Sequence, residues 1–352
     1  MLISAYSTRH EHCPHEFTIV AERARWHNSG EDAQLAGHLD ALADYIRAET
    51  AESWTFGAHA LLRHVTDTQR WYSFDLDETD PSQLARLSGW ASEANAILMV
   101  DGALLDAQGR PLLTGAHGAG SGEVPRSDET VRRAAEIREW LSAERQVGVP
   151  VGLTPVRGSQ EVRVRNADEV GLRVLALVLT SDFARSVVAG EPLDPSAMAS
   201  VFPRSFAALS PAERELFASR DADLARRAQA RIEAAQELLW TLSMITFGWP
   251  SRACSVERIE RLTLTGGEQD FLQGLVVRPL PDLLNEYECL ASLVWALDAV
   301  RRQQHPPIPE THPVICAERL AALSWLLNPQ VTWDDADQYD RGYWRRPQAV
   351  RS

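Results

Sequence analysis

The sequence predicts an α+β protein. An N-terminal α/β-sandwich-like domain, a sheet with helices on one face, precedes a predominantly α-helical domain. Residues 1–114 mix strand-like and helix-like segments, whereas residues 126–340 carry repeated helix-start signals and helical spacing of apolar residues. Residues 115–125, GAHGAGSGEVP, are rich in Gly and Ser, as is typical of a linker. Residues 341–352 form a basic, aromatic tail.

The elements of the first domain follow from local signals. Asp80-Pro81-Ser82-Gln83 combines an N-cap acceptor, a Pro at the first helical position and a Gln at N3, so it predicts a helix that runs to about residue 95. Asp101-Gly102 and Gln108-Gly109 predict the turns of a last hairpin. Amphipathic spacing predicts a further helix over 32–48, and strands are expected over 2–7, 17–24, 59–76 and 96–100.

Capping motifs also organise the second domain. Capping boxes begin at Asn166 and Ser210, and the first of these helices ends near Gly190. Asn328-Pro329 stops the last helix. The other expected helices cover about 127–146, 222–247, 281–304 and 313–327.

Composition excludes several classes of function. The 352 residues include 49 acidic and 35 basic side chains, so the net charge is 35 − 49 = −14, and every basic residue is Arg. Schiff-base and pyridoxal-phosphate enzymes, P-loop nucleotidases and protein kinases each require a Lys, so they are excluded. The acidic balance disfavours nucleic acid. The tail, with Arg345 and Arg346 beside Trp344, could stack on single strands, but a frayed terminus explains it more simply.

Localisation follows from what the sequence lacks. No apolar run approaches the ~18–20 residues that span a bilayer, so we expect no membrane association. No secretion signal is recognisable at the first residues. The cysteines form no C-x-x-C pair, which indicates reduced thiols and a cytoplasmic protein. They are Cys13, Cys254, Cys289 and Cys316.

Two tracts invite a metal interpretation that we do not favour. His10-Glu-His12-Cys13-Pro-His15 is dense in ligand types, but no second Cys pair or H-E-x-x-H completes a tetrahedral shell. Asp335, Asp337 and Asp340 have the wrong spacing for a calcium loop. We therefore expect no metal and no cofactor. A Ser-His-Asp triad stays open, although His305 and His312 lie in a proline-rich stretch typical of loop and cap residues.

The sharpest internal signal is a repeat of Glu and Trp seven residues apart, which places both on one helix face. It occurs as Glu288–Trp295 and Glu318–Trp325, with a looser copy at Glu233–Trp240. One interpretation is a pocket of carboxylates walled by indoles. The other, which we favour, is a repeated packing unit with Trp in the core and Glu paired with Arg. The candidate residues are Glu233, Trp240, Glu288, Trp295, Glu318, Arg319 and Trp325.

From about residue 132 to 337 the chain resembles the bacterial domain-of-unknown-function family 4272. The resemblance rests on GVPV from Gly148, RNADEVGLRVLAL from Arg165, ELLWTLSMI from Glu237, ERLAALSWLL from Glu318 and WDD from Trp333. The family usually has Asn where this chain has Ser324, and Thr-Pro after the WDD segment. The resemblance implies a fold and no activity, so it transfers no catalytic residue.

These observations favour a non-catalytic binding or protein-interaction module, because Trp and Arg anchor interfaces. Its partner would be a protein or a small ligand, and its oligomeric state is open. The alternative is a hydrolase-type enzyme that uses the Glu/Trp-lined pocket.

We predict that 1–114 and 126–340 fold separately, because the Gly-rich stretch buries little area and holds the backbone weakly. Limited proteolysis should cut first within 115–125. A first cut inside either predicted domain would contradict the prediction.

We also predict that the purified protein holds no stoichiometric transition metal, because the His10–His15 tract lacks a complete ligand shell. Elemental analysis tests this prediction. A content of about one zinc per chain, lost in His12→Ala and His15→Ala, would contradict it.

Overall fold

The computed structural model describes residues 1–27, 33–51, 55–77, 79–113, 120–304 and 306–336. These residues form two compact units. The sheet unit consists of 1–135 and 150–162, and the helical unit of 136–149 and 163–336. Residues 115–119 of the expected linker, His305 and the tail at 341–352 lie outside the described residues. Separate folding of 1–114 and 126–340 stays a prediction for proteolysis.

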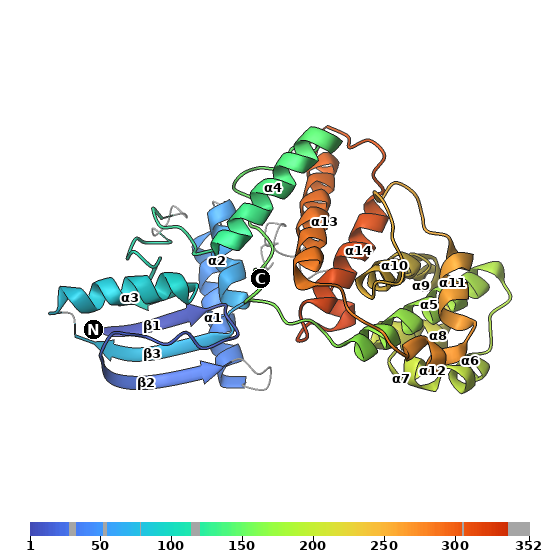
Figure 1. Ribbon diagram of the computed structural model, residues 1–352, viewed down its shortest axis with the longest axis horizontal. Helices are drawn as coiled ribbons and strands as arrows, with labels where there is room; N and C mark the ends of the chain where they lie inside the picture. Colours follow the sequence, from blue (N-terminus) through green and yellow to red (C-terminus); the bar gives the residue numbers. More distant parts are fainter. Residues whose placement is uncertain (28–32, 52–54, 78, 114–119, 305, 337–352) are drawn as a thin grey trace. The chain divides into compact units, whose positions relative to one another are not determined.

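The sheet unit is built on five antiparallel strands in the order β2-β3-β1-β4-β5. Figure 1 shows β2, β3 and β1 side by side in that order. In the register of the central strand, Ala5 lies opposite Tyr72 on one side and Leu98 on the other. The strands are β1 (Leu2–Ser7), β2 (Ile19–His27), β3 (Arg70–Leu76), β4 (Ala96–Val100) and β5 (Ala103–Leu105).

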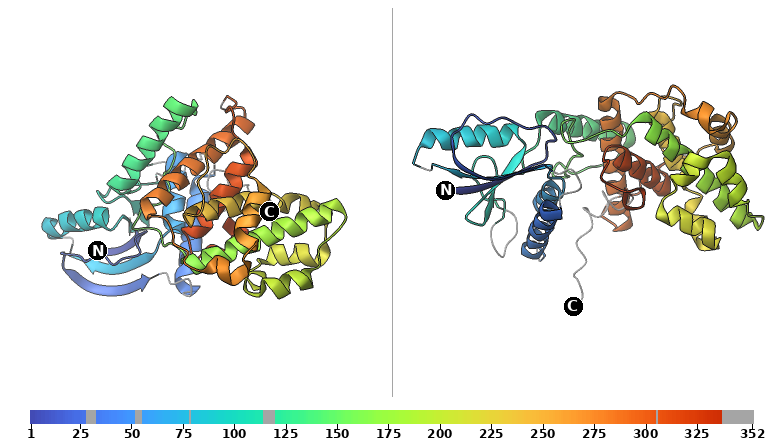
Figure 2. Two further views of the ribbon diagram at one scale, coloured as in Figure 1. Left: turned by 45° about the vertical axis from the view of Figure 1, so that its right-hand side comes forward. Right: turned by 90° about the horizontal axis from the view of Figure 1, so that it is seen from below.

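Both faces of this sheet carry helices, so the expectation of a single covered face was wrong. Alternate residues of a strand point to opposite faces. Ile3 and Ala5 pack with Trp90 of α3, whereas Tyr6 packs with Ile46 of α1 and with α2. The right-hand view of Figure 2 shows α3 and α1 on the two sides of the sheet. These helices are α1 (Ala33–Glu49), α2 (Phe56–Thr66) and α3 (Pro81–Glu93).

The expected long strand over 59–76 is instead helix α2 followed by β3. The Thr55 side chain accepts a hydrogen bond from the backbone N–H of Ala58 and so caps the helix. Residues 58–65 are all buried, the polar His59, Arg63 and His64 included, so this stretch has no solvent-exposed face. A short segment that is buried all round does not show the amphipathic period that distinguishes a helix from a strand.

The helical unit is arranged around α5, which packs against α7, α8, α9, α10, α11 and α12. Its residues are buried almost all round from Val170 to Ala184. A Cβ at Gly171 would come within 2.7 Å of side-chain atoms of Leu272 and Leu275, so this position admits no larger residue without displacement. The α+β class is therefore confirmed, with the helices following the sheet.

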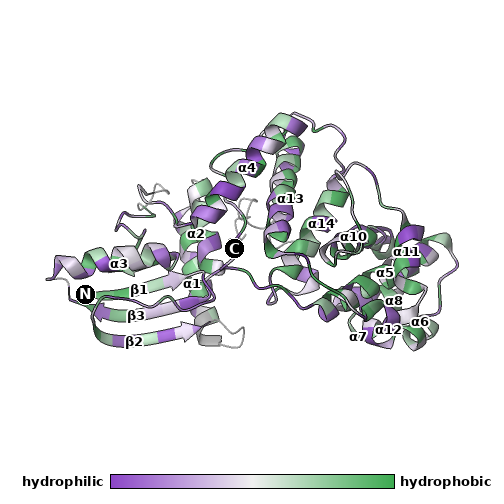
Figure 3. Cartoon of the chain, viewed as in Figure 1, coloured by the Kyte–Doolittle hydropathy of each residue, from purple (hydrophilic) through white to green (hydrophobic). Residues whose placement is uncertain are grey.

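The helices of this second part of the chain have the following bounds. They are α4 (Asp128–Arg145), α5 (Ala167–Ala189), α6 (Pro195–Val201), α7 (Pro203–Ala207), α8 (Pro211–Ser219), α9 (Ala222–Ala228), α10 (Arg231–Thr241), α11 (Val256–Leu264), α12 (Gly267–Leu272), α13 (Leu280–Arg301) and α14 (Pro313–Leu326). Figure 3 shows α14 as largely hydrophobic, whereas α4 carries many hydrophilic residues. Within the described ranges, no helix is both long and apolar enough to cross a membrane.

The single helix expected over 222–247 is broken between α9 and α10 and ends at Thr241. The hydroxyl of Ser181 on α5 donates to the carbonyl of Gln229, 3.1 Å away. Glu233, whose N–H would normally bond that carbonyl, bonds to Ala230 instead. A tertiary contact thus terminates a helix that local propensity would continue.

The expected N-caps are confirmed, and the complete capping box is confirmed at Ser210. Asn166 accepts from the N–H of Glu169, and the helix ends on Gly190 in the left-handed conformation at φ 81°. Ser210 and Glu213 form both bonds of a capping box. Asp80 accepts from the N–H of Ser82 at the start of α3.

Strand β2 lies at one edge of the sheet. Its pairing with β3 is irregular at two places, between Ile19 and Ala21 and between Glu22 and Ala24. Arg23 forms an ion pair with Asp75 across the strands.

Candidate functional site

The helices that carry the Glu–Trp repeat are neighbours. Helix α14 packs against both α10 and α13. Leu238, Leu293 and Leu323, which lie between each Glu and its Trp in sequence, are completely buried. This arrangement agrees with the packing interpretation of the repeat.

The indoles of the repeat have separate surroundings. Trp325 is buried, with the Arg165 guanidinium 4.3 Å from its ring centroid and the Trp333 ring 5.8 Å away. Trp240 is half-buried, with the Arg278 guanidinium 4.8 Å from its ring. Trp295 is also half-buried. Two of the three indoles therefore pack with different arginines.

The glutamates of the repeat also have separate roles. Glu318 is paired with Arg231, whose Nη1 lies 3.0 and 3.2 Å from its two oxygens. Glu233 accepts a hydrogen bond from the N–H of Cys254 at 2.8 Å. Glu288 is buried on α13. Convergence of the three carboxylates on one ligand stays untested.

Arg319 lies beside a carboxylate that sequence analysis missed. Its Nε is 4.0 Å from Oε2 of Glu237, and its guanidinium lies 4.2 Å from the ring of Phe247. Glu237 is completely buried, and burial followed by the nearby Glu286 raises its pKa well above the usual value, against the lowering effect of Arg319. Glu237 follows Glu233 by four residues, and this i,i+4 spacing could have indicated that the two glutamates lie on the same face of α10.

The thiols of this unit do not offer a nucleophile. Burial raises the pKa of Cys254, Cys289 and Cys316, to about 12 for Cys316. A thiol with a raised pKa carries little thiolate at neutral pH and is therefore unreactive.

A pocket of about 570 Å³ opens in the helical unit and is lined by residues of α5, α8, α9, α10, α13 and α14. We call it the arginine pocket, because four guanidinium-bearing side chains from three helices line it. They are Arg226 and Arg227 of α9, Arg231 of α10 and Arg301 of α13.

The acidic side chains of the arginine pocket already have partners. Nη2 of Arg173 donates to both carboxylate oxygens of Glu213, and Glu318 pairs with Arg231. Asp334 accepts from the hydroxyl of Ser210 and the N–H of Ala212. These carboxylates are therefore held by the protein itself and do not neutralise the remaining arginines.

Two groups at the arginine pocket lack such a partner. Arg227 is exposed and has no acidic partner among the residues that the structure describes. Thr180 is 1% exposed, and its hydroxyl has no hydrogen-bond partner in the described part of the chain. Because a buried hydroxyl without a partner is costly, a ligand or water that bonds it would be favoured.

An apolar wall also lines the arginine pocket. It includes Leu216, Leu224, Val314 and Ala317, of which Val314 is well exposed. The pocket therefore suits a molecule that combines an anionic group with an apolar body.

A second, smaller depression of about 370 Å³ lies around Trp325 and Trp333. Its Arg165 donates to the carbonyls of Trp325, Pro329 and Val331, at 2.9 Å each. Because these carbonyls occupy the guanidinium, we assign Arg165 a structural role.

The histidines of the N-terminal tract make ordinary protein contacts. Nδ1 of His12 is 3.2 Å from the hydroxyl of Tyr72, and Nδ1 of His15 is 3.1 Å from the carbonyl of Phe17. Within the described ranges, no three His, Cys, Asp or Glu side chains are grouped so that they could hold a metal ion. Metal content stays a prediction for elemental analysis.

Comparison with known proteins adds a family but no function. Residues 133–336 match the family described as "Domain of unknown function (DUF4272)". No curated protein and no solved structure matches the chain.

We predict that Trp325→Ala lowers the free energy of unfolding by about 3–5 kcal/mol, because it leaves a cavity beside Trp333. Glu318→Gln should cost only about 1 kcal/mol, because the pair with Arg231 is partly exposed. Denaturant melts would measure both, with the exposed Glu144→Gln as control. Equal losses in the two variants would contradict the packing interpretation.

Proposed function

The chain belongs to the family described as "Domain of unknown function (DUF4272)", and on that basis we propose a function from the geometry of the helical unit alone. We propose that this unit is a non-catalytic binding module. Its ligand is an organic molecule with a carboxylate or phosphate group, bound in the arginine pocket.

One observation carries the proposal: four arginines line a single pocket whose acidic side chains are bonded to other protein groups. The guanidinium fork matches carboxylate and phosphate oxygens in a bidentate manner. Arg227 is the foremost contact for the ligand, and Arg301, paired with Asp298 at 3.4 Å, is the second.

The size and polarity of the pocket support a small organic ligand. Its volume lies within the range of ~300–1,000 Å³ that is usual for ligand pockets. The apolar wall would hold a hydrocarbon or ring, while the arginines hold the anionic group. The net charge of −14 repels anions at long range, so affinity would depend on these local contacts.

Binding is favoured over hydrolysis by the state of the candidate nucleophiles and acids. Glu233 and Glu318 bond to Cys254 and Arg231, and the Cys254 thiol has a raised pKa. A general acid or base must be able to reach its substrate. None of these contacts favours the hydrolase alternative.

The test is calorimetric titration of the full chain with citrate and with pyrophosphate at constant ionic strength. We expect saturable binding of at least one probe. The double variant R227Q/R301Q should weaken it by about tenfold or more, since each lost charge-assisted hydrogen bond is worth about 1.5–3 kcal/mol.

The matched control is Arg204→Gln, which removes an exposed arginine that pairs with Asp168 away from the arginine pocket. It should bind like the parent protein. Absence of saturable binding of both probes would overturn the proposal, as would equal losses in R204Q and in the double variant. If a poly-glutamate peptide bound more tightly than either probe, the ligand would be an acidic protein segment and not a small molecule.

A further inference from the structure

A carboxyl group without a hydrogen-bond donor lies where α10 packs against α14 in the helical unit. Glu237 of α10 is completely buried, and neither of its oxygens has a hydrogen-bond partner in the described part of the chain. Arg319 of α14 approaches it, but Nε of Arg319 lies 4.0 Å from Oε2, beyond hydrogen-bond distance. An ionised carboxylate is unfavourable in this place, because burial removes its hydration and no bonded donor replaces it.

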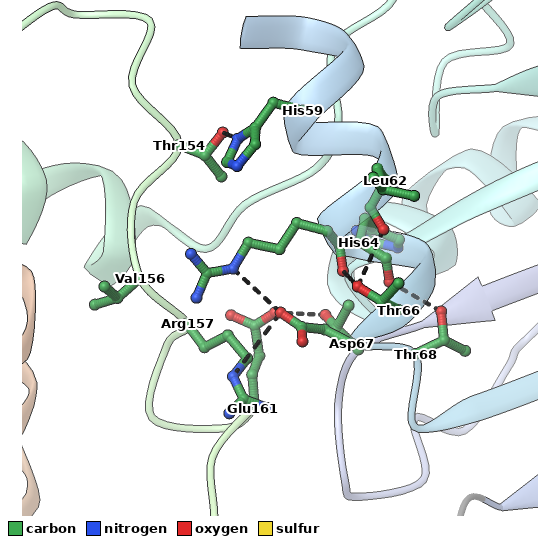
Figure 4. A network of polar contacts seen from close by, with 12 residues as sticks. His59, Leu62, His64, Thr66, Asp67, Thr68, Thr154, Val156, Arg157 and Glu161 are labelled. Carbon is green, nitrogen blue, oxygen red and sulfur yellow. Dashed lines mark hydrogen bonds and ion pairs between the residues drawn. The ribbon is translucent and has the colours of Figure 1, made fainter. Parts of the chain in front are cut away.

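Other buried carboxylates of this chain are bonded. In the sheet unit, Asp67 accepts a hydrogen bond from Nε of Arg63 at 3.3 Å, and Nε of Arg157 lies 3.9 Å away (Figure 4). In the helical unit, Glu213 accepts from Nη2 of Arg173 at 2.5 and 2.6 Å. The buried glutamate of α10 therefore differs from these groups in its partners and not in its burial.

The charged groups around Glu237 do not balance one another. Among the described residues, the charged side chains that act on it are Glu286 of α13 and Arg319 of α14. Arg319 also donates from Nη1 to the carbonyl of Gly248 at 3.3 Å. One guanidinium thus faces two carboxylates, and a single bound proton would make the three groups neutral together. Burial disfavours any net charge, so it favours the protonated set.

The other titratable neighbours do not supply the missing positive charge. Glu233, one turn earlier on α10, accepts a hydrogen bond from the N–H of Cys254. Burial raises the pKa of Cys254, Cys289 and Cys316, so these thiols are neutral at neutral pH. Helices α5 and α11 also pack against α10, but within the described ranges no charged group of theirs acts on Glu237.

We propose that Glu237 is a proton-linked switch in the contact between α10 and α14. Its carboxyl group holds a proton while the two helices are packed, and it releases that proton to water when the contact opens. The same two helices are joined by the ion pair between Arg231 and Glu318, so opening would also break this pair. The proposal does not rest on ligand binding in the arginine pocket.

The direction of the pH dependence follows from the folded state. Burial, and then the charge of Glu286, raises the pKa of Glu237 well above its usual value. In the unfolded chain a glutamate is ionised above about pH 5. Unfolding above that pH therefore releases a proton. The stabilising contribution of the switch is complete at lower pH and is lost as the pH rises towards the raised pKa.

The test compares the full chain with Glu237→Gln in denaturant melts between about pH 5 and pH 8. Glutamine has the shape of a protonated glutamate and cannot ionise. The unfolding constant of the parent, divided by that of the variant, should rise by up to about tenfold per pH unit until the raised pKa is reached. A fixed cost of burying the amide leaves this slope unchanged.

The matched control is Glu144→Gln, which removes an exposed carboxylate of the same unit. Its ratio should stay the same at every pH, because an exposed carboxylate is ionised in both the folded and the unfolded state. Amide hydrogen exchange locates the effect. After correction for the intrinsic rate, the protection of α10 and α14 should fall with rising pH in the parent and not in E237Q.

Infrared spectroscopy tests the parent protein without any variant. At neutral pH the spectrum should contain the C=O stretch of a protonated carboxyl group, which exposed carboxylates do not give because they are ionised. Absence of this band would overturn the proposal, and so would a constant ratio for E237Q. A band that persists in E237Q and vanishes in Glu286→Gln would place the proton on Glu286 and refute the assignment to Glu237.

Discussion

The carboxylate of Glu161 holds together three segments of the sheet unit. It joins three parts of the chain: Thr8 after β1, Asn95 before β4 and Gly158 in its own segment. A buried carboxylate is stable only when its oxygens are bonded, so these three donors and Glu161 depend on one another. The positions of these three segments in the sheet unit therefore depend on the same set of buried hydrogen bonds.

The sequence predicted the elements that are determined by local contacts. It did not predict features that are determined by contacts between residues far apart in the chain. The caps at Asn166 and Ser210 involve residues three positions apart, so they could be predicted from the sequence. The break after α9 depends on Ser181, 48 positions before Gln229, and has no local signal. The Glu–Trp repeat likewise predicted a packing unit in which Glu pairs with an Arg, but not that the partner of Glu318 would be Arg231, 87 positions away.

Arginine alone supplies the cationic side chains of this chain, and the helical unit uses the planarity of the guanidinium. Arg165, Arg173 and Arg278 each lie within 4.8 Å of an indole ring while their N–H groups bond to carbonyls or carboxylates. A lysine ammonium cannot stack and fork at once in this way. In this chain, which has no Lys, Arg therefore packs against aromatic rings and bonds polar groups at the same time.

The edge strand β2 bears on how the protein behaves at high concentration. An unpaired strand edge is a template for association with a second molecule, and a flat, regular edge is the most susceptible. The two irregularities in β2 bend its backbone, and its exposed segment carries Glu22, Arg23 and Arg25. A second sheet could pair there only by straightening the strand and desolvating these charges, so the same features that complete the fold oppose aggregation through this edge.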